Sequence, residues 1–385
     1  MKITDMIYNI GVTDKIIDLF EGQYPVPDGM TYNSYAIMDE KIAVMDTVDA
    51  NFTEEWLDNL ETVLGNKAPD YLIIQHMEPD HSANIDIFMK KYPAATIVAS
   101  AKSFAMMKNF FGTDYAGRNL VVGEGDSLLL GTHILNFITA PMVHWPEVIM
   151  TYDATDRILF SADAFGRFGA IDTLDDWTHE GRRYYMGIVA KYGPQVQAVL
   201  KKIANLDIQK ICSLHGPVIN TYIPYFLDLY QTWSSYQPEA SGIVVTYTSI
   251  YGNTKKAAEL LVQKLQEFGC DEVVTYDLAR CDLSEAVADA FRYDRLILAS
   301  PTYNGDVFPF MRIFIDHLKE RNFRNRKVAF MENGSWAPTA AKVMQGMLEK
   351  SQNLTYADTT VKILSAVNEE ALLQIENLAK EMCRG

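Results

Sequence analysis

The chain has few cysteines, and no two of them have the spacing that is found in rubredoxin or zinc-ribbon modules. Four cysteines occur in 385 residues, and no two of them form a C-x-x-C motif. A rubredoxin-type or zinc-ribbon module needs such pairs, and a disulfide framework is typical of short, cysteine-dense secreted chains, so both are excluded. We therefore expect all four cysteines to be buried free thiols: Cys212, Cys270, Cys281 and Cys383.

Long apolar runs and excess positive charge are also missing. No run approaches the roughly 20 apolar residues of a membrane-spanning helix, and the N-terminal stretch MKITDMIYNIGV lacks the pattern of a signal peptide. Lysine and arginine total 34 against 50 acidic residues, a formal net charge of −16. Such a surface repels phosphate, which argues against nucleic acid or a membrane as partner. A cytoplasmic protein is the expectation.

Length and patterning indicate two domains. A chain of 385 residues exceeds the roughly 100 to 200 that one domain usually takes. The polar stretch SSYQPEASG (234–242) is typical of a linker, so we predict domains over residues 1–238 and 242–385. The first half mixes short β-rich runs with amphipathic stretches, which predicts stacked sheets covered by helices. The second half alternates five strands with five helices, which predicts a doubly wound parallel sheet.

One short segment of the first half is crowded with metal-binding side chains. The stretch QHMEPDHS places His76, Glu78, Asp80 and His81 within six residues, directly after the apolar strand YLIIQ. Sites of α/β proteins usually lie on loops at the carboxyl ends of strands. Alternate residues of a tight loop point to opposite sides, so these four side chains can reach two ions.

Three further metal-binding side chains follow predicted strands downstream. They are His144 in APMVHWPE, Asp163 in LFSADAFG and His215 in CSLHGP. A single histidine of this kind is more often structural than a ligand. The combination with four ligand-type residues in six reverses that balance, because core packing does not explain it. The other histidines lack such neighbours and are interpreted as surface or structural residues: His133, His179 and His317.

The second half opens with a candidate phosphate loop. The stretch TYTSIYGNT runs from the first strand of the alternating pattern into its first helix. Glycine permits close approach, the polar side chains offer donors, and a helix N-terminus favours a phosphate dianion. No G-x-G-x-x-G motif is present, so a mononucleotide flavin fits better than a dinucleotide. The predicted binding residues of this loop are Thr248, Ser249, Ile250, Tyr251, Gly252, Asn253 and Thr254.

Two later loops lie where a flavin ring would be held. SPTYNGDVFP follows the third strand, and ENGSWAP follows the fourth. Backbone amides of the first loop can hydrogen-bond the ring edge, and Trp336 can stack on the ring. Core packing is the alternative for Trp336. The predicted residues are Pro301, Thr302, Tyr303, Asn304, Gly305, Asn333, Gly334, Ser335 and Trp336.

The metal pattern resembles the metallo-β-lactamase superfamily, with one departure. That superfamily usually has His-x-His-x-Asp-His and two zinc ions, whereas Glu78 replaces the second histidine here. A carboxylate-rich set suits iron better than zinc, and the added negative charge stabilises oxidised ions. Together with a flavodoxin-like half, the sequence resembles the flavodiiron proteins over essentially its whole length. That resemblance implies a metallo-β-lactamase-like αββα sandwich followed by a flavodoxin-like domain with a five-stranded parallel sheet.

The resemblance also implies cofactors and a ligand set. It implies FMN and two non-haem irons per chain, one held by His76, Glu78 and His144. The second iron would take Asp80, His81 and His215, with Asp163 bridging both; His81 is the ligand that varies within the family. A phenol of RRYYMGIVAKYGP, Tyr192, is the candidate for hydrogen-bonding a reaction intermediate, and helix packing is its alternative.

The implied activity is reduction of O2 to water or of NO to N2O, in oxygen or nitric oxide detoxification. The donor would be external, either rubredoxin or reduced coenzyme F420, because the chain looks like the minimal two-domain class. A head-to-tail homodimer or homotetramer would bring the flavin of one chain beside the metals of another. Two other functions compete: a dizinc hydrolase with an appended flavodoxin domain, and a plain electron carrier with a degenerate first domain.

Overall fold

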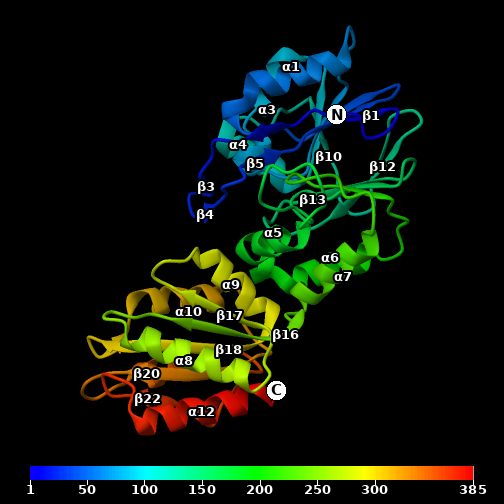
Figure 1. Cartoon of the computed structure of the whole chain (residues 1–385). Coiled ribbons are helices and arrows are strands. Elements are labelled where there is room, and N and C mark those ends of the chain that lie inside the picture. Colours follow the sequence, from blue (N-terminus) through cyan, green and yellow to red (C-terminus); the bar gives the residue numbers. More distant parts are fainter. Residues whose placement is uncertain (385) are drawn as a thin grey trace. The chain divides into compact units, whose positions relative to one another are not determined.

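Residues 1–384 are described by the computed structural model, and they form two compact units, one over Met1–Gln231 and one that begins at Thr232. Figure 1 follows the chain through both. Among the described residues, no helix combines the length and the hydropathy that crossing a membrane requires.

Two sheets form the core of the first unit. One sheet has the order β1-β6-β7-β8-β9-β10, and the other has the order β11-β12-β13-β14-β15. Apolar residues of both sheets, such as Ile73 and Phe137, belong to one buried cluster, so the sheets face each other. The strands of the first sheet are β1 (Ile7–Asn9), β6 (Tyr35–Met38), β7 (Ile42–Met45), β8 (Tyr71–Ile74), β9 (Thr96–Ala99) and β10 (Asn119–Val121). Those of the second are β11 (Ser127–Leu129), β12 (Ile134–Thr139), β13 (Ile149–Asp153), β14 (Ile158–Phe160) and β15 (Lys210–Cys212).

Helices cover the outer faces of this sandwich (Figure 1), as the αββα expectation requires. Their ends follow ordinary capping rules: in α4, Ser100 accepts a hydrogen bond from Ser103 N, and Gly112 ends the helix at φ +72°. The helices are η1 (Ala50–Phe52), α1 (Thr53–Leu64), α2 (Pro79–Ser82), α3 (Ile85–Lys91), α4 (Ala101–Phe111), α5 (Trp177–Tyr184), η2 (Tyr185–Val189), η3 (Ala190–Tyr192), α6 (Gly193–Ile203) and α7 (Ile223–Ser234). Two small two-stranded antiparallel sheets pair β2 (Val12–Asp14) with β5 (Met30–Tyr32) and β3 (Leu19–Phe20) with β4 (Tyr24–Pro25).

The second unit is the predicted doubly wound sheet. Its strands run in the order β17-β16-β18-β20, followed by β21 and β22 on the same edge, and these pairs are all parallel. The strands are β16 (Ala240–Tyr247), β17 (Val273–Asp277), β18 (Tyr293–Tyr303), β19 (Asp306–Val307), β20 (Lys327–Asn333), β21 (Thr355–Tyr356) and β22 (Val361–Ile363). The helices are α8 (Asn253–Glu267), α9 (Leu283–Arg292), α10 (Pro309–Glu320), α11 (Ala340–Met347) and α12 (Glu369–Cys383).

Four local features differ from the sequence predictions. The fifth strand is divided between β21 and β22, and a short antiparallel strand, β19, pairs with the end of β18. The predicted linker is shorter than 234–242, because α7 ends at Ser234 and β16 begins at Ala240. The expectation of four free thiols is wrong for two of them: Cys270 and Cys383 form a disulfide, whereas Cys212 and Cys281 are free.

Candidate metal centre and flavin pocket

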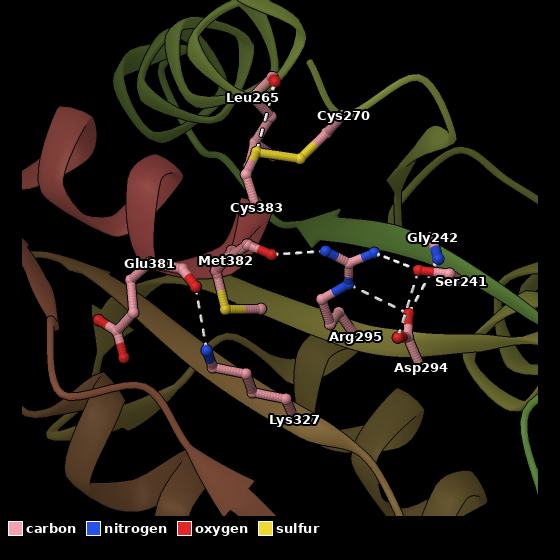
Figure 2. Close-up of a disulfide and its surroundings, with 10 residues drawn as sticks. All are labelled: Ser241, Gly242, Leu265, Cys270, Asp294, Arg295, Lys327, Glu381, Met382 and Cys383. Carbon is pink, nitrogen blue, oxygen red and sulfur yellow. Dashed lines mark hydrogen bonds and ion pairs between the residues drawn. A yellow bond between two sulfur atoms is a disulfide. The ribbon is translucent and has the colours of Figure 1, made fainter. Parts of the chain in front are cut away.

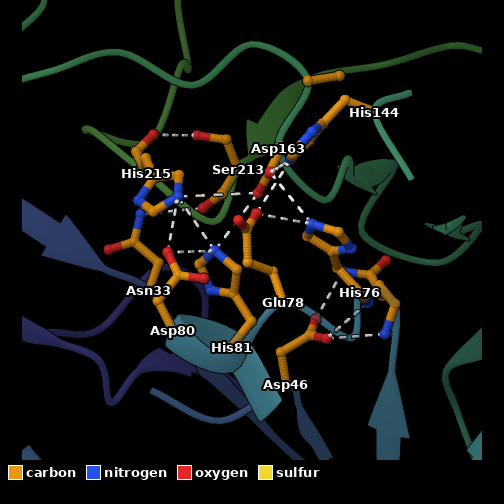
Figure 3. A network of polar contacts seen from close by, with 12 residues as sticks. Asn33, Asp46, His76, Glu78, Asp80, His81, His144, Asp163, Ser213 and His215 are labelled. Carbon is orange, nitrogen blue, oxygen red and sulfur yellow. Dashed lines mark hydrogen bonds and ion pairs between the residues drawn. The ribbon is translucent and has the colours of Figure 1, made fainter. Parts of the chain in front are cut away.

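The seven predicted metal ligands meet at the carboxyl ends of strands in the first unit (Figure 3). His76 and Glu78 follow β8, Asp163 follows β14, and His215 follows β15. Asp80 and His81 lie on the short helix α2 rather than on a loop, because Pro79 occupies its first turn, where no backbone N–H is needed. His144 lies between β12 and β13.

One group of four side chains surrounds a common point. Glu78 Oε2 lies 3.2 Å from His76 Nε2 and 3.0 Å from His144 Nε2. Asp163 Oδ2 lies 3.4 Å and 3.0 Å from the same two nitrogens. All four ligand atoms lie within 4.8 Å of one another, which suits coordination of one ion.

A second group is formed by Asp80, His81 and His215. His81 Nε2 lies 3.0 Å from His215 Nε2, and Asp80 Oδ2 lies 3.2 Å and 3.4 Å from these nitrogens. The other oxygen of Asp163, Oδ1, lies 3.4 Å from His81 Nε2 and 3.8 Å from His215 Nε2. One carboxylate therefore faces both groups, an oxygen to each.

The polar atoms of this site fit cations. Both oxygens of Asp80 and Oδ1 of Asp163 are buried without a hydrogen-bond partner, which is costly unless a cation is bound. Burial raises the pKa of Asp80 to about 7, because its charged form is poorly solvated there. Burial, with the nearby His81, lowers the pKa of His215 to about 4, so its ring is neutral and has a lone pair for a metal. The donor set of imidazole nitrogens and carboxylate oxygens therefore suits two metal ions.

Hydrogen bonds from outside the cluster fix two of the histidine rings. Glu147 Oε1 accepts from His76 Nδ1 at 2.8 Å, and the carbonyl of Thr31 accepts from His215 Nδ1 at 2.8 Å. A ring whose Nδ1 donates in this way can present the lone pair of its Nε2 to a metal ion. The backbone before His76 is held by buried Asp46, which accepts from Gln75 N at 2.7 Å.

Sequence reasoning missed these supporting residues, and Glu147 is the one with the clearest testable role. Replacing Glu147 with alanine should weaken metal binding at His76 about 10- to 100-fold, because the ring loses the carboxylate that orients it. The measurement is anaerobic competition between the protein and a chelator. Glu124→Ala, which removes a half-exposed carboxylate, is the control. Equal metal affinities for wild type and Glu147→Ala would contradict this role.

The structure brings a different tyrosine to the cluster than the predicted one. Tyr184 is fully buried, its ring centroid lies 5.6 Å from that of His215, and its hydroxyl has no hydrogen-bond partner. Burial, with the negative charges of Asp163 and Glu78, raises its pKa. Tyr192 is half-buried at the end of η3, with Lys191 Nζ 5.8 Å from its ring centroid, so its predicted role stays a prediction.

The predicted flavin residues surround a cavity of about 650 Å³ in the second unit. The loops after β16, β18 and β20 line it, and all predicted residues except Thr248 and Gly252 take part. Thr248 is buried behind the loop and donates to Ser300 Oγ at 3.2 Å. Three lining residues were not predicted: Ala337, Thr339 and Ser365.

The cavity has the features that a flavin phosphate and ring require. α8 begins at one side of it, and the first N–H groups of a helix have no partners within the helix. Gly252 precedes α8 at φ +90°, a conformation that favours glycine, and no protein atom lies within 4 Å of where its Cβ would be. Trp336 is 82% exposed at the cavity, so core packing is excluded for it. The residues present fit a flavin mononucleotide.

Comparisons with known proteins show which families the two halves of the chain match. The family described as "ODP family beta lactamase" matches residues 30–216, and the flavodoxin domain family matches residues 244–363. A nitric oxide reductase of Moorella thermoacetica is 30% identical over 91% of this chain and 90% of its own. The solved rubredoxin oxygen:oxidoreductase of Desulfovibrio gigas has a TM-score of 0.93 at 25% identity, covering 100% of this chain and 98% of its own.

A flavodiiron protein of Giardia intestinalis has a TM-score of 0.91 at 25% identity, covering 100% of this chain and 96% of its own. The predicted fold class is thereby confirmed, since both halves match the expected families and the fold matches over the full length. This chain is similar in sequence to a nitric oxide reductase, and its fold matches those of the two solved proteins over its full length. It therefore belongs to the flavodiiron family.

Proposed function

We propose that this protein is an oxidoreductase that reduces O2 to water or NO to N2O at a non-haem diiron site supplied with electrons by FMN. The observation that carries the proposal is the placement of Asp163, whose two carboxylate oxygens face two separate ligand groups. A bridging carboxylate of this kind holds two ions as a pair. The names of the relatives, nitric oxide reductase and rubredoxin-oxygen oxidoreductase, support both substrates.

The residues of the chain favour iron over zinc. One ion would be held by His76, Glu78 and His144, and the other by Asp80, His81 and His215, with Asp163 shared. Three carboxylates among seven ligands balance most of the charge of two divalent ions and favour their oxidised states. When bound, two ferrous ions and a reduced flavin supply the four electrons that reduction of O2 to water consumes.

Other side chains prepare the site without taking part in electron transfer. Glu147 and the Thr31 carbonyl orient His76 and His215, as their hydrogen bonds show. Phe20 packs its ring edge on His215 at 5.3 Å between centroids and so helps to keep water from the second ligand group. At the flavin pocket, the N-terminus of α8 would hold the phosphate of FMN, and Trp336 and Tyr251, which line the pocket, would be the aromatic side chains available to its ring.

Tyr184 provides a hydrogen-bond donor at the metal site, and its removal should be visible in turnover. Tyr184→Phe should lower the turnover number about tenfold, the effect of losing one hydrogen bond of roughly 1.4 kcal/mol in the transition state. Tyr192→Phe is the matched comparison, and steady-state kinetics with O2 and NO is the measurement. A loss confined to Tyr192→Phe would return the role to the residue predicted from sequence.

A zinc hydrolase with an appended flavodoxin domain is the alternative function, and Glu78 in place of histidine counts against it. Anaerobically reduced protein should consume O2 or NO when supplied with reduced rubredoxin or reduced coenzyme F420, tested in turn. Failure to consume either gas with either donor, in protein loaded with iron and FMN, would contradict the proposal. The same kinetics rank O2 against NO and identify the class of donor.

Several finer predictions accompany this proposal. The domain limits at residues 238 and 242, the cytoplasmic location and the head-to-tail homodimer or homotetramer stay predictions. Sedimentation of the FMN-loaded protein tests the assembly.

A further inference from the structure

A disulfide ties together the ends of two helices in the flavin-binding unit (Figure 2). Cys270 follows α8, Cys383 is the last residue of α12, and their Cα atoms lie 5.9 Å apart. The two cysteines are 113 residues apart in sequence, so the bond closes a loop that includes most of this unit. Cross-linking a loop of that length removes much conformational freedom from the unfolded chain.

A second set of contacts holds the same helix end without sulfur. Arg295 Nη1 donates to the carbonyl of Met382 at 2.6 Å, and Lys327 Nζ donates to the carbonyl of Glu381 at 3.0 Å (Figure 2). The Glu381 carboxylate also accepts from Asp358 N at 2.7 Å. Cations suit the C-terminal end of a helix, whose carbonyls carry partial negative charge. α12 is therefore anchored at residues 381 and 382 whether or not Cys383 is cross-linked.

The Cys383 sulfur also has a partner available in its reduced state. Its Sγ lies 3.5 Å from the carbonyl of Leu265, within reach of an S–H donor. Opening the disulfide therefore leaves the Cys383 thiol with a carbonyl partner and the end of α12 still anchored. We therefore expect the flavin-binding unit to fold whether this disulfide is open or closed.

The two residues of the disulfide are partly exposed at the edge of the core of this unit. Cys270 and Cys383 are half-buried, unlike Cys212, which is fully buried. Access of this kind is what thiol–disulfide exchange requires.

We propose that Cys270 and Cys383 are a reversible thiol modification site that exchanges with low-molecular-weight thiols and disulfides. In the forward direction, one thiolate attacks the disulfide of the small molecule and releases one small thiol. The second cysteine then attacks the mixed disulfide, forms the protein S–S bond and releases the second small thiol. The protein thus loses two electrons and two protons, and the small disulfide gains both.

The expected consequence is a flavin-binding unit whose resistance to unfolding depends on thiol redox conditions. Closing the bond should raise its melting temperature by roughly 5 to 15 °C, given the loop length and the size of the unit. Oxidising surroundings, in which an O2- or NO-reducing enzyme is needed, would then stabilise the flavin-binding unit. Only the statement that the enzyme is needed in oxidising surroundings rests on the proposed function.

The experiment equilibrates the FMN-loaded full chain in anaerobic buffers with varied ratios of reduced and oxidised glutathione. Alkylation and peptide mass mapping measure the fraction of linked Cys270–Cys383, and flavin fluorescence measures melting. The linked fraction should rise with oxidised glutathione and fall again when reduced glutathione is restored. Cys383→Ser and Cys270→Ser should both fold, bind FMN and melt at the temperature of reduced wild type in every buffer.

Cys281→Ser is the matched control, because it removes a free half-buried cysteine of the same unit and should behave as wild type. Three results would overturn the proposal: no linked peptide in oxidising buffer, equal melting temperatures for the two redox forms, or failure of the serine variants to fold. A loss of gas reduction with reversible linkage intact would instead contradict only the proposed function.

Discussion

Replacing Asp163 with alanine should lower O2 and NO reduction by a factor of roughly 1,000 or more, because metal catalysis of this kind contributes several kcal/mol. Asp163 is the only side chain of the seven that faces both ligand groups, at 3.0 Å from His144 Nε2 and 3.4 Å from His81 Nε2. Without it, two ions are no longer held as a pair. Steady-state gas consumption by the anaerobically reduced variant is the measurement.

The flavin should be unaffected by that change, since Asp163 belongs to the first compact unit and the flavin pocket to the second. Flavin absorbance and melting temperature therefore serve as internal checks on folding. Asp207→Asn, which alters a 59% exposed carboxylate of the same unit, is the control and should keep full activity. If Asp163→Ala consumed either gas at the wild-type rate, the assigned metal site would be wrong.

Replacing Gly252 with valine should weaken FMN binding about 10- to 100-fold, a change of roughly 1.4 to 2.7 kcal/mol in binding free energy. The left-handed backbone at φ +90° strains a β-branched residue, and no protein atom lies within 4 Å of the new Cβ. The side chain would thus occupy open space beside the N-terminus of α8, where the phosphate is expected. Titration of the apoprotein with FMN, followed by quenching of flavin fluorescence, measures the effect.

Gly269 supplies a matched control at the opposite end of the same helix. It has φ +85° and likewise no atom of the surrounding protein within 4 Å of where a Cβ would lie, but it follows the C-terminal end of α8, whereas Gly252 lies between Tyr251 and Asn253, which line the flavin cavity. Gly269→Val should therefore show the same backbone strain with unchanged FMN affinity. Equal losses in both variants would mean that strain alone, rather than the phosphate site, explains the result for Gly252.

The strand-end residues of both sites were predictable because their position depends on local pattern. An apolar strand followed by polar, glycine-containing or ligand-type residues fixes a loop at one edge of a sheet, as for His76 after β8 and Ser249 after β16. In the second unit, the parallel direction of the strands follows from the alternation of strands and helices, whereas their order was not predicted. His76 follows β8 of the first sheet, whereas His144 and Asp163 follow strands of the second sheet, so their meeting depends on how the two sheets pack together.

Residues that act through long-range contacts were not predictable in the same way. Glu147 lies 71 positions from His76, and no local pattern marks the hydrogen bond between them. Tyr184 was one of several tyrosines in one segment, and the π-helical turn η2 that follows α5 alters the helical spacing there. The pairing of Cys270 with Cys383 depends on α8 and α12 packing side by side, which cysteine spacing does not reveal.

Elemental analysis and the visible spectrum of the purified protein test the central assignment most directly. We predict two iron atoms and one FMN per chain, with a yellow colour that survives the Asp163→Ala change while the iron is lost. A colourless protein that retains two zinc ions per chain and takes up neither iron nor FMN would contradict this assignment.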